Sequence, residues 1–335
     1  MTYNHLIANS QPQTYAGSGG IAPAAMLGTT TPGVPYFGGV FNQNTYGQPS
    51  IITGANGIVG QTQDIGKVRV SYDFTPKDRI EYMSGIWAQV QNMNNQSFIT
   101  DANGVPIYNT QFPNGTNTAT NSSYNSTLAV GPFTQQPGAM QLQHVGAQHL
   151  MNALTIKRDS GGTFDYDFTL TSYNYLRDFT NSTANYGFLP STSQNPRGSA
   201  HPSGYIVNPT GQNSQWNGTF WRTGDARMIY RPDRDMMGKH EISYGAHSDE
   251  YSLNYNQFVT SFWPSSYNLG QYNFSGGKTT LNSIYVQDAW KVLPSWKVTL
   301  GARDDYWNAL NGYGSGGAVG PNPTNVPAKA GYPLG

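Results

Sequence analysis

Apolar and polar residues alternate with a period of two in several stretches of the chain. The clearest stretch is residues 66–74, where the apolar positions are Val68, Val70, Tyr72 and Phe74. Lysine, arginine, serine and aspartate occupy the positions between them. Side chains of an extended strand point alternately to its two faces, so this pattern predicts a strand with one apolar face and one polar face.

Similar stretches occur in four pairs, and each pair is joined by a short connection of turn-forming residues. These connections are residues 75–78, 158–162, 231–239 and 293–295. Between the pairs lie three long stretches, most of them rich in Asn, Ser, Thr and Gly, at about 92–137, 178–217 and 253–278. The sequence therefore predicts about eight antiparallel strands of ~10 residues, with short and long connections in alternation.

The sustained pattern covers residues 65–308. Residues 1–64 are rich in Gly, Pro, Asn, Gln and Thr without a sustained period, so we expect a loop-rich segment there. Residues 309–335 also have the composition of a loop. Residues 1–30 contain no basic segment followed by an apolar one, as a signal peptide would. We expect both ends of the chain to be cut from a longer sequence.

Aromatic residues stand within a few positions of the short turns. They are Phe74, Phe164, Tyr230, Trp290 and Trp296. In an outer-membrane barrel such a girdle marks one membrane interface. In a soluble sandwich the same rings would pack the ends of the hairpins. We favour the girdle, because five aromatic residues at the same end of four hairpins are hard to obtain from a sandwich.

The composition supports a protein that faces lipid. Of the 335 residues only 11% are charged, against roughly a quarter in soluble domains. The formal net charge is zero, which argues against binding of nucleic acid. The chain has no cysteine, so disulfides and thiolate chemistry are excluded. No apolar run of ~18 residues is present, which excludes a transmembrane helix.

Motifs that would carry catalysis or metal binding depart from their patterns. Residues 275–280, SGGKTT, lack the first glycine of a phosphate-binding loop, because Tyr272 holds its position. Asp165 and Asp167 could be paired catalytic carboxylates, and His247 and Asp249 could be metal ligands. For both pairs we favour a structural role as polar residues of a barrel wall. We therefore predict a protein that is not an enzyme and needs no cofactor or metal.

Two hairpins resemble those of TonB-dependent receptors, the large outer-membrane barrels of Gram-negative bacteria. One of them carries Tyr285, Gln287, Asp288 and Trp290 on its first arm and Leu300, Gly301, Arg303 and Asp304 on its second. The other is residues 70–82, VSYDFTPKDRIEY. The resemblance implies an all-β fold: an antiparallel transmembrane β-barrel of 22 strands, of which this chain would supply about eight, with long extracellular loops.

The resemblance also implies a function and partners. Receptors of this family bind and import scarce ligands such as ferric siderophores, cobalamin or oligosaccharides. The complex of TonB, ExbB and ExbD supplies the energy by acting on a plug domain, which we expect to lie outside this sequence. Outer-membrane lipid would surround the apolar face. An unplugged porin and a surface-exposed β-rich adhesin or structural module remain alternatives, although we find no repeats of fixed period that would favour the adhesin.

The resemblance assigns roles to polar and aromatic residues. The residues expected to line the lumen are Arg69, Arg79, Glu81, Asp165, Asp167, Arg227, Glu241 and Arg303. Ligand contacts are expected from aromatic residues of the loops, namely Trp216, Trp221, Phe262 and Trp263. These four aromatic residues could equally anchor the packing of the loops.

Overall fold

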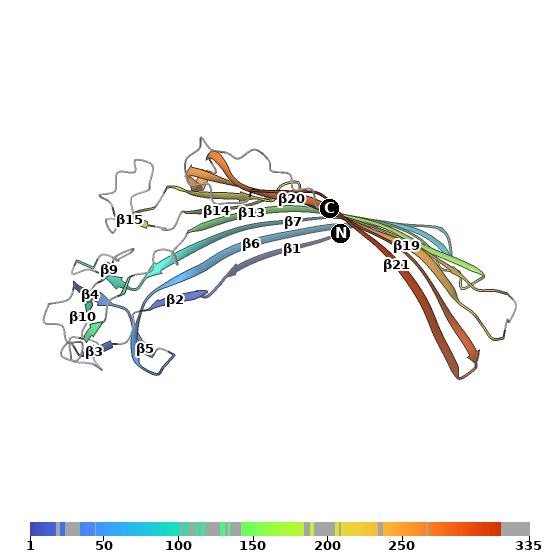
Figure 1. Ribbon diagram of the computed structural model, residues 1–335, viewed down its shortest axis with the longest axis horizontal. Coiled ribbons are helices and arrows are strands. Elements are labelled where there is room, and N and C mark those ends of the chain that lie inside the picture. Colours follow the sequence, from blue (N-terminus) through green and yellow to red (C-terminus); the bar gives the residue numbers. More distant parts are fainter. Residues whose placement is uncertain are drawn as a thin grey trace.

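A computed structural model shows an all-β chain built on one large antiparallel sheet of 12 strands (Figure 1). The structure describes residues 1–17, 21–23, 34–43, 45–100, 103–104, 106, 111–112, 115–117, 128–130, 133–134, 142–183, 188–190, 205–207, 209–233, 237–265 and 267–315. Within these ranges the one helical segment is the short 3₁₀ turn η3 (Trp263–Ser265).

Nine strands follow one another across the sheet in the order β1, β6, β7, β13, β14, β17, β19, β20, β21. The sheet has three more strands: β18 lies between β14 and β19, as β17 does, while β2 and β5 pair with β6. The bounds are β1 (Thr2–Asn9), β2 (Thr14–Gly17), β5 (Val40–Gln43), β6 (Pro49–Thr75), β7 (Asp78–Ser97), β13 (Gln143–Arg158), β14 (Phe164–Thr183), β17 (Gly211–Gln215), β18 (Phe220–Tyr230), β19 (Ile242–Phe262), β20 (Tyr267–Leu293) and β21 (Trp296–Gly314).

Nine short strands form three small sheets. Their bounds are β3 (Ile21–Pro23), β4 (Val34–Gly38), β8 (Ile99–Thr100), β10 (Gly115–Asn117) and β11 (Leu128–Val130) in the first, β9 (Gln111–Phe112) and β12 (Phe133–Thr134) in the second, and β15 (Phe188–Pro190) and β16 (Tyr205–Val207) in the third. Those labelled in Figure 1 lie at the end of the large sheet that is opposite to the short turns.

The four predicted short connections are confirmed as links between antiparallel strands, although residues 234–236 of the third lie outside the described residues. They join β6 to β7, β13 to β14, β18 to β19 and β20 to β21, and each of these pairs is antiparallel. The prediction was correct here because a period-two pattern stops sharply at residues that favour turns.

The predicted lengths of the strands and loops are wrong. Strands β6 and β20 have 27 residues each instead of ~10. Residues 1–64 are not simply a loop, because they contain β1 and the first part of β6, and β21 runs on to Gly314. The expected long loop at 253–278 is mostly strand. In these segments apolar, polar and glycine residues are mixed on both faces, so no period-two alternation marks them as strands.

The register gives the sheet two different faces, because directly paired residues of an antiparallel sheet point to the same side. One row runs from Val70 to Tyr82, Leu154 and Leu170. We call this side the apolar face. The next row of paired residues along the strands contains Glu81 and points to the opposite side of the sheet. We call that side the polar face.

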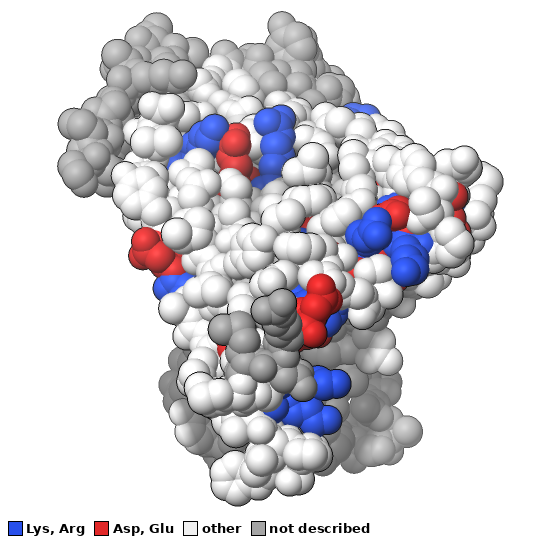
Figure 2. Space-filling model, turned by 90° about the vertical axis from the view of Figure 1, so that its right-hand side faces the viewer, with Lys and Arg blue, Asp and Glu red and all other residues white. Residues whose placement is uncertain are grey.

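The predicted division of side chains between these faces is confirmed by the register. Val68, Val70, Phe168, Leu170, Val298 and Leu300 lie on the apolar face, while Arg69, Asp167 and Thr299 lie on the other. On the side of the molecule seen in Figure 2, charged side chains form a few small clusters, most of them with acidic and basic groups side by side, and the rest of the described surface there is uncharged.

Candidate ligand-binding face

All eight residues that were expected to line a lumen lie on the polar face. Asp73 pairs with Arg79, and Asp167 pairs with Arg227. Glu241 joins the same side because it exchanges two backbone hydrogen bonds with Ala289. The full set on this face is Arg69, Arg79, Glu81, Asp165, Asp167, Arg227, Glu241 and Arg303. The structure thus brings them to one side of one sheet.

Ion pairs fix several of these side chains near the short turns. Arg69 lies 3.1 Å from Glu81, nitrogen to oxygen. Arg231 connects two carboxylates, with distances of 2.6 Å to Asp165 and 2.7 Å to Glu241. The Asp165 carboxylate also accepts hydrogen bonds from the backbone N–H groups of the turn at residues 160 and 161. These charges therefore stabilise the hairpin ends and are already paired.

A second polar cluster occupies the middle of β18, β19, β20 and β21. His247 lies between two carboxylates, with its Nδ1 2.6 Å from Asp225 and its Nε2 2.8 Å from Asp249. Next to it Arg303 donates to Asp305 at 2.7 Å and to the Ser283 hydroxyl at 2.8 Å. Ser283 in turn donates to Asp305. We call these six residues the central cluster.

Three aromatic residues lie on the polar face beside the central cluster. Trp221 pairs with Tyr251 across β18 and β19, and their ring centroids are 6.5 Å apart. Trp307 on β21 pairs with Leu281, which in turn pairs with Asp249. The Trp221 Nε1 group donates a 3.4 Å hydrogen bond to Asp249. Aromatic rings and charged groups therefore share one area of the face.

A third cluster surrounds His149, which is buried between β7 and β14. Its ring stacks on Tyr175 with a centroid distance of 3.9 Å. Its Nδ1 lies 2.8 Å from the Tyr173 hydroxyl, and its Nε2 lies 2.9 Å from the Asp178 carboxylate. Burial raises the pKa of the Asp178 carboxyl, and the hydrogen bond to His149 opposes that rise. The backbone carbonyl of Asp178 accepts a 2.9 Å hydrogen bond from the N–H of Trp216, which holds the segment between β17 and β18 against β14.

The four aromatic residues expected to contact a ligand from loops do not form one group. Trp221 lies in β18, so its placement in a loop is wrong. Trp216 packs against Tyr255 with a centroid distance of 5.1 Å, and Phe262 ends β19. Trp263 is buried in η3. Of the four, only Trp221 stands beside the central cluster of the polar face.

Sequence reasoning missed Tyr251 and Trp307 as members of this area. Both continue the period-two patterns of their strands, so each could have been assigned to the polar face. Their proximity to Trp221 depends on the register between four neighbouring strands, which the pattern of one strand does not contain.

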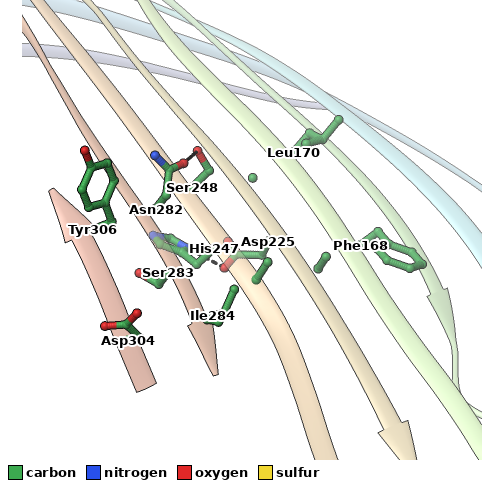
Figure 3. A pocket seen from close by; sticks show the side chains of 13 residues that line it. Phe168, Leu170, Asp225, His247, Ser248, Asn282, Ser283, Ile284, Asp304 and Tyr306 are labelled. Atoms are coloured by element: carbon green, nitrogen blue, oxygen red, sulfur yellow. Dashed lines mark hydrogen bonds and ion pairs between the residues drawn. The ribbon is translucent and has the colours of Figure 1, made fainter. Parts of the chain in front are cut away.

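The apolar face has a hollow of about 650 Å³ behind the central cluster (Figure 3). Its floor consists of residues with small side chains, Gly224, Ala226 and Ala246, and larger side chains such as Leu170 and Ile284 stand beside it. The hollow exists because the neighbouring strands place their smallest residues at paired positions. It belongs to the side of the sheet that we expected to meet lipid.

Among the described residues no group of three or more histidine, aspartate or glutamate side chains has an arrangement that could hold a metal ion. Nor does any helix in the described part of the chain have the length and apolar character needed to cross a membrane. No protein-family model, no curated protein and no solved structure matches the chain.

Proposed function

We propose that this chain forms part of the wall of an outer-membrane β-barrel, in a TonB-dependent receptor that imports a scarce small-molecule ligand. The apolar face would contact outer-membrane lipid, and the polar face would line the lumen. The proposal rests on the resemblance of the two hairpins and on the two-sided character of the sheet. No enzymatic step is part of it.

The observation that carries this proposal is the exposure of large apolar side chains on one face of many neighbouring strands. Val70 and Leu170 are each 60% exposed, and Leu300 is 63% exposed. Soluble proteins rarely expose a contiguous apolar patch of more than a few hundred Å². Outward-facing apolar side chains that alternate with polar inward ones are what a barrel strand in lipid requires.

The edges of the sheet also fit a wall that is larger than this chain. Strands β1 and β21 end the pairing order of the described residues, so each has one edge without a described partner. In hydrocarbon an unpaired backbone group costs several kcal/mol, which is why membrane-spanning sheets close into barrels. We therefore propose that further strands complete the barrel.

The experiment that tests the proposal is uptake by cells that express the complete protein. We expect the protein in the outer-membrane fraction, and we expect uptake of its ligand to be lost when TonB is deleted. A point mutation of TonB that abolishes coupling, compared with a restored wild-type copy, gives the matched control. Uptake that does not need TonB would reject the receptor and favour an unplugged porin. A protein found outside the outer membrane would reject both.

A further inference from the structure

Three exposed aromatic rings stand together on the polar face. Trp221, Tyr251 and Trp307 are 54%, 39% and 62% exposed, respectively. We call them the aromatic platform. Since β18, β19, β20 and β21 are consecutive neighbours, Trp221 and Trp307 are three strand spacings apart, roughly 14 Å. Large rings presented to water in this way mark contact sites rather than a core.

The strand between the rings has smaller side chains. On β20 the residue paired with Tyr251 is Thr279, and the residue paired with Trp307 is Leu281. The platform therefore has rings at both sides of a lower strip. A flat molecule longer than a single ring could lie across that strip and touch both sides.

Hydrogen-bonding groups of the central cluster lie directly beside the platform. Asp249 accepts from the Trp221 Nε1 group and pairs with Leu281 in the register. Asp305 lies two residues before Trp307 on the same face of β21, because side chains of a strand repeat on one side with a period of two. The Asp249 carboxylate thus lies in the row of Trp307, and the Asp305 carboxylate and the Ser283 hydroxyl lie in the next row. The Arg303 guanidinium reaches that next row through its hydrogen bonds to Asp305 and Ser283.

The cations of the central cluster are already occupied. His247 is held by two carboxylates, and Arg303 is held by Asp305. Asp225, Asp249 and Asp305 make the cluster more acidic than basic, since Arg303 and His247 are its only basic members. An anionic ligand would have to compete with these ion pairs and would meet surplus negative charge.

We infer that the aromatic platform and the central cluster bind a neutral oligosaccharide. This inference rests on the proposed receptor function and names the class of its ligand. A sugar ring has apolar C–H faces, which stack on indole and phenol rings, and hydroxyl groups at its edge. Those hydroxyls can donate to carboxylates and accept from a guanidinium. The rings of the platform can therefore stack on the sugar, while the neighbouring Asp and Arg groups, which are fixed by their ion pairs, can bind its hydroxyls.

The test is equilibrium binding to the purified complete protein in detergent micelles. The probes are maltotriose, cellotriose and chitotriose, with choline and an anionic ferric catecholate as comparisons, and binding is followed by titration calorimetry. We expect at least one trisaccharide to bind. Trp221→Ala and Trp307→Ala should each weaken it by at least tenfold, while Trp307→Tyr should keep much of the affinity because it keeps a ring.

Trp296→Ala is the matched control, because this tryptophan is also exposed but begins β21 at the short turn, away from the platform. Its affinity for the trisaccharide should equal that of the wild type. Failure of all three trisaccharides to bind, or equal effects of the Trp296 and Trp307 variants, would overturn the inference. Binding of choline or ferric catecholate that depends on Trp307 would overturn it as well. Binding in micelles does not involve TonB, so this result is independent of the uptake experiment.

Discussion

Replacing Val70 by arginine tests which side of the sheet meets lipid. Val70 lies on the apolar face and is 60% exposed. It is five residues from the end of β6 at Thr75, which is about 17 Å along the strand. With a strand tilt of ~45° this corresponds to about 12 Å along the membrane normal, close to the middle of an apolar band ~25 Å tall.

At that depth an arginine costs about 2–4 kcal/mol, which corresponds to roughly a 30- to 700-fold loss in the folding equilibrium. Ser71→Arg is the matched control, because it introduces the same side chain one residue later on the polar face. Ser71 pairs with Glu81, so the new arginine would face a carboxylate. We expect the control to change stability by no more than ~1 kcal/mol, as exposed ion pairs do.

The assay is folding of the complete protein from urea into phospholipid vesicles, with the folded fraction followed at equilibrium over a urea series. We expect the Val70→Arg midpoint to lie well below the wild-type value and the Ser71→Arg midpoint to stay near it. Equal losses for the two variants would refute the assignment of the apolar face to lipid. A larger loss for Ser71→Arg would reverse the two faces.

Three further changes test the clusters that hold the sheet together. Asp165→Asn should destabilise the β13–β14 hairpin by about 1–3 kcal/mol, because it removes the charge of a buried carboxylate that binds turn N–H groups and the partly exposed Arg231. Asp159→Asn in the same turn should have little effect in urea unfolding, because Asp159 is exposed. His149→Phe should cost a similar amount by removing the hydrogen-bond partner of the partly buried Asp178 carboxylate, seen as a lower thermal midpoint. Gly211→Ala should loosen the β14–β17 pairing in hydrogen exchange, because its Cβ would collide with a β14 carbonyl oxygen, while Gly314→Ala, with its nearest atom at 3.6 Å, should not.

The sequence predicts the hairpins well because their two faces differ. Residues such as Val70 and Leu170 alternate with polar neighbours, and a shift of one residue would expose the wrong face. The first part of β6, from Pro49 to Asp64, has no such contrast. It is held in part by backbone pairing with β1, where His5 pairs with Asp64 and Asn9 pairs with Gly60. A ladder of this kind leaves little trace in the order of side chains.

The candidate site was predictable in its polarity but not in its composition. The charged residues of the polar face follow from alternation alone, as Asp167 and Arg227 illustrate. The aromatic platform combines three strands that are far apart in sequence. Its assembly depends on how β18, β19 and β21 align with one another, and the stretch between their two hairpins, residues 253–278, has a pattern that resembles a loop.

The height of the aromatic platform on the sheet explains how the two faces could work together. On the apolar face of β14 and β18, the residues are aromatic, aliphatic or glycine from the short turns up to the row of Ser172 and Arg222, eight residues from the start of β14. That is about 27 Å along the strand and about 20 Å along the membrane normal, near the height of an apolar band. Trp221 precedes Arg222 on the opposite face, so the platform lies level with the point where the strands would leave lipid. Strand β14 continues ten residues beyond Tyr173, the partner of Trp221, so a ligand arriving from outside would pass this upper part of the wall first. It would then meet the rings before it reached the ion pairs near the short turns.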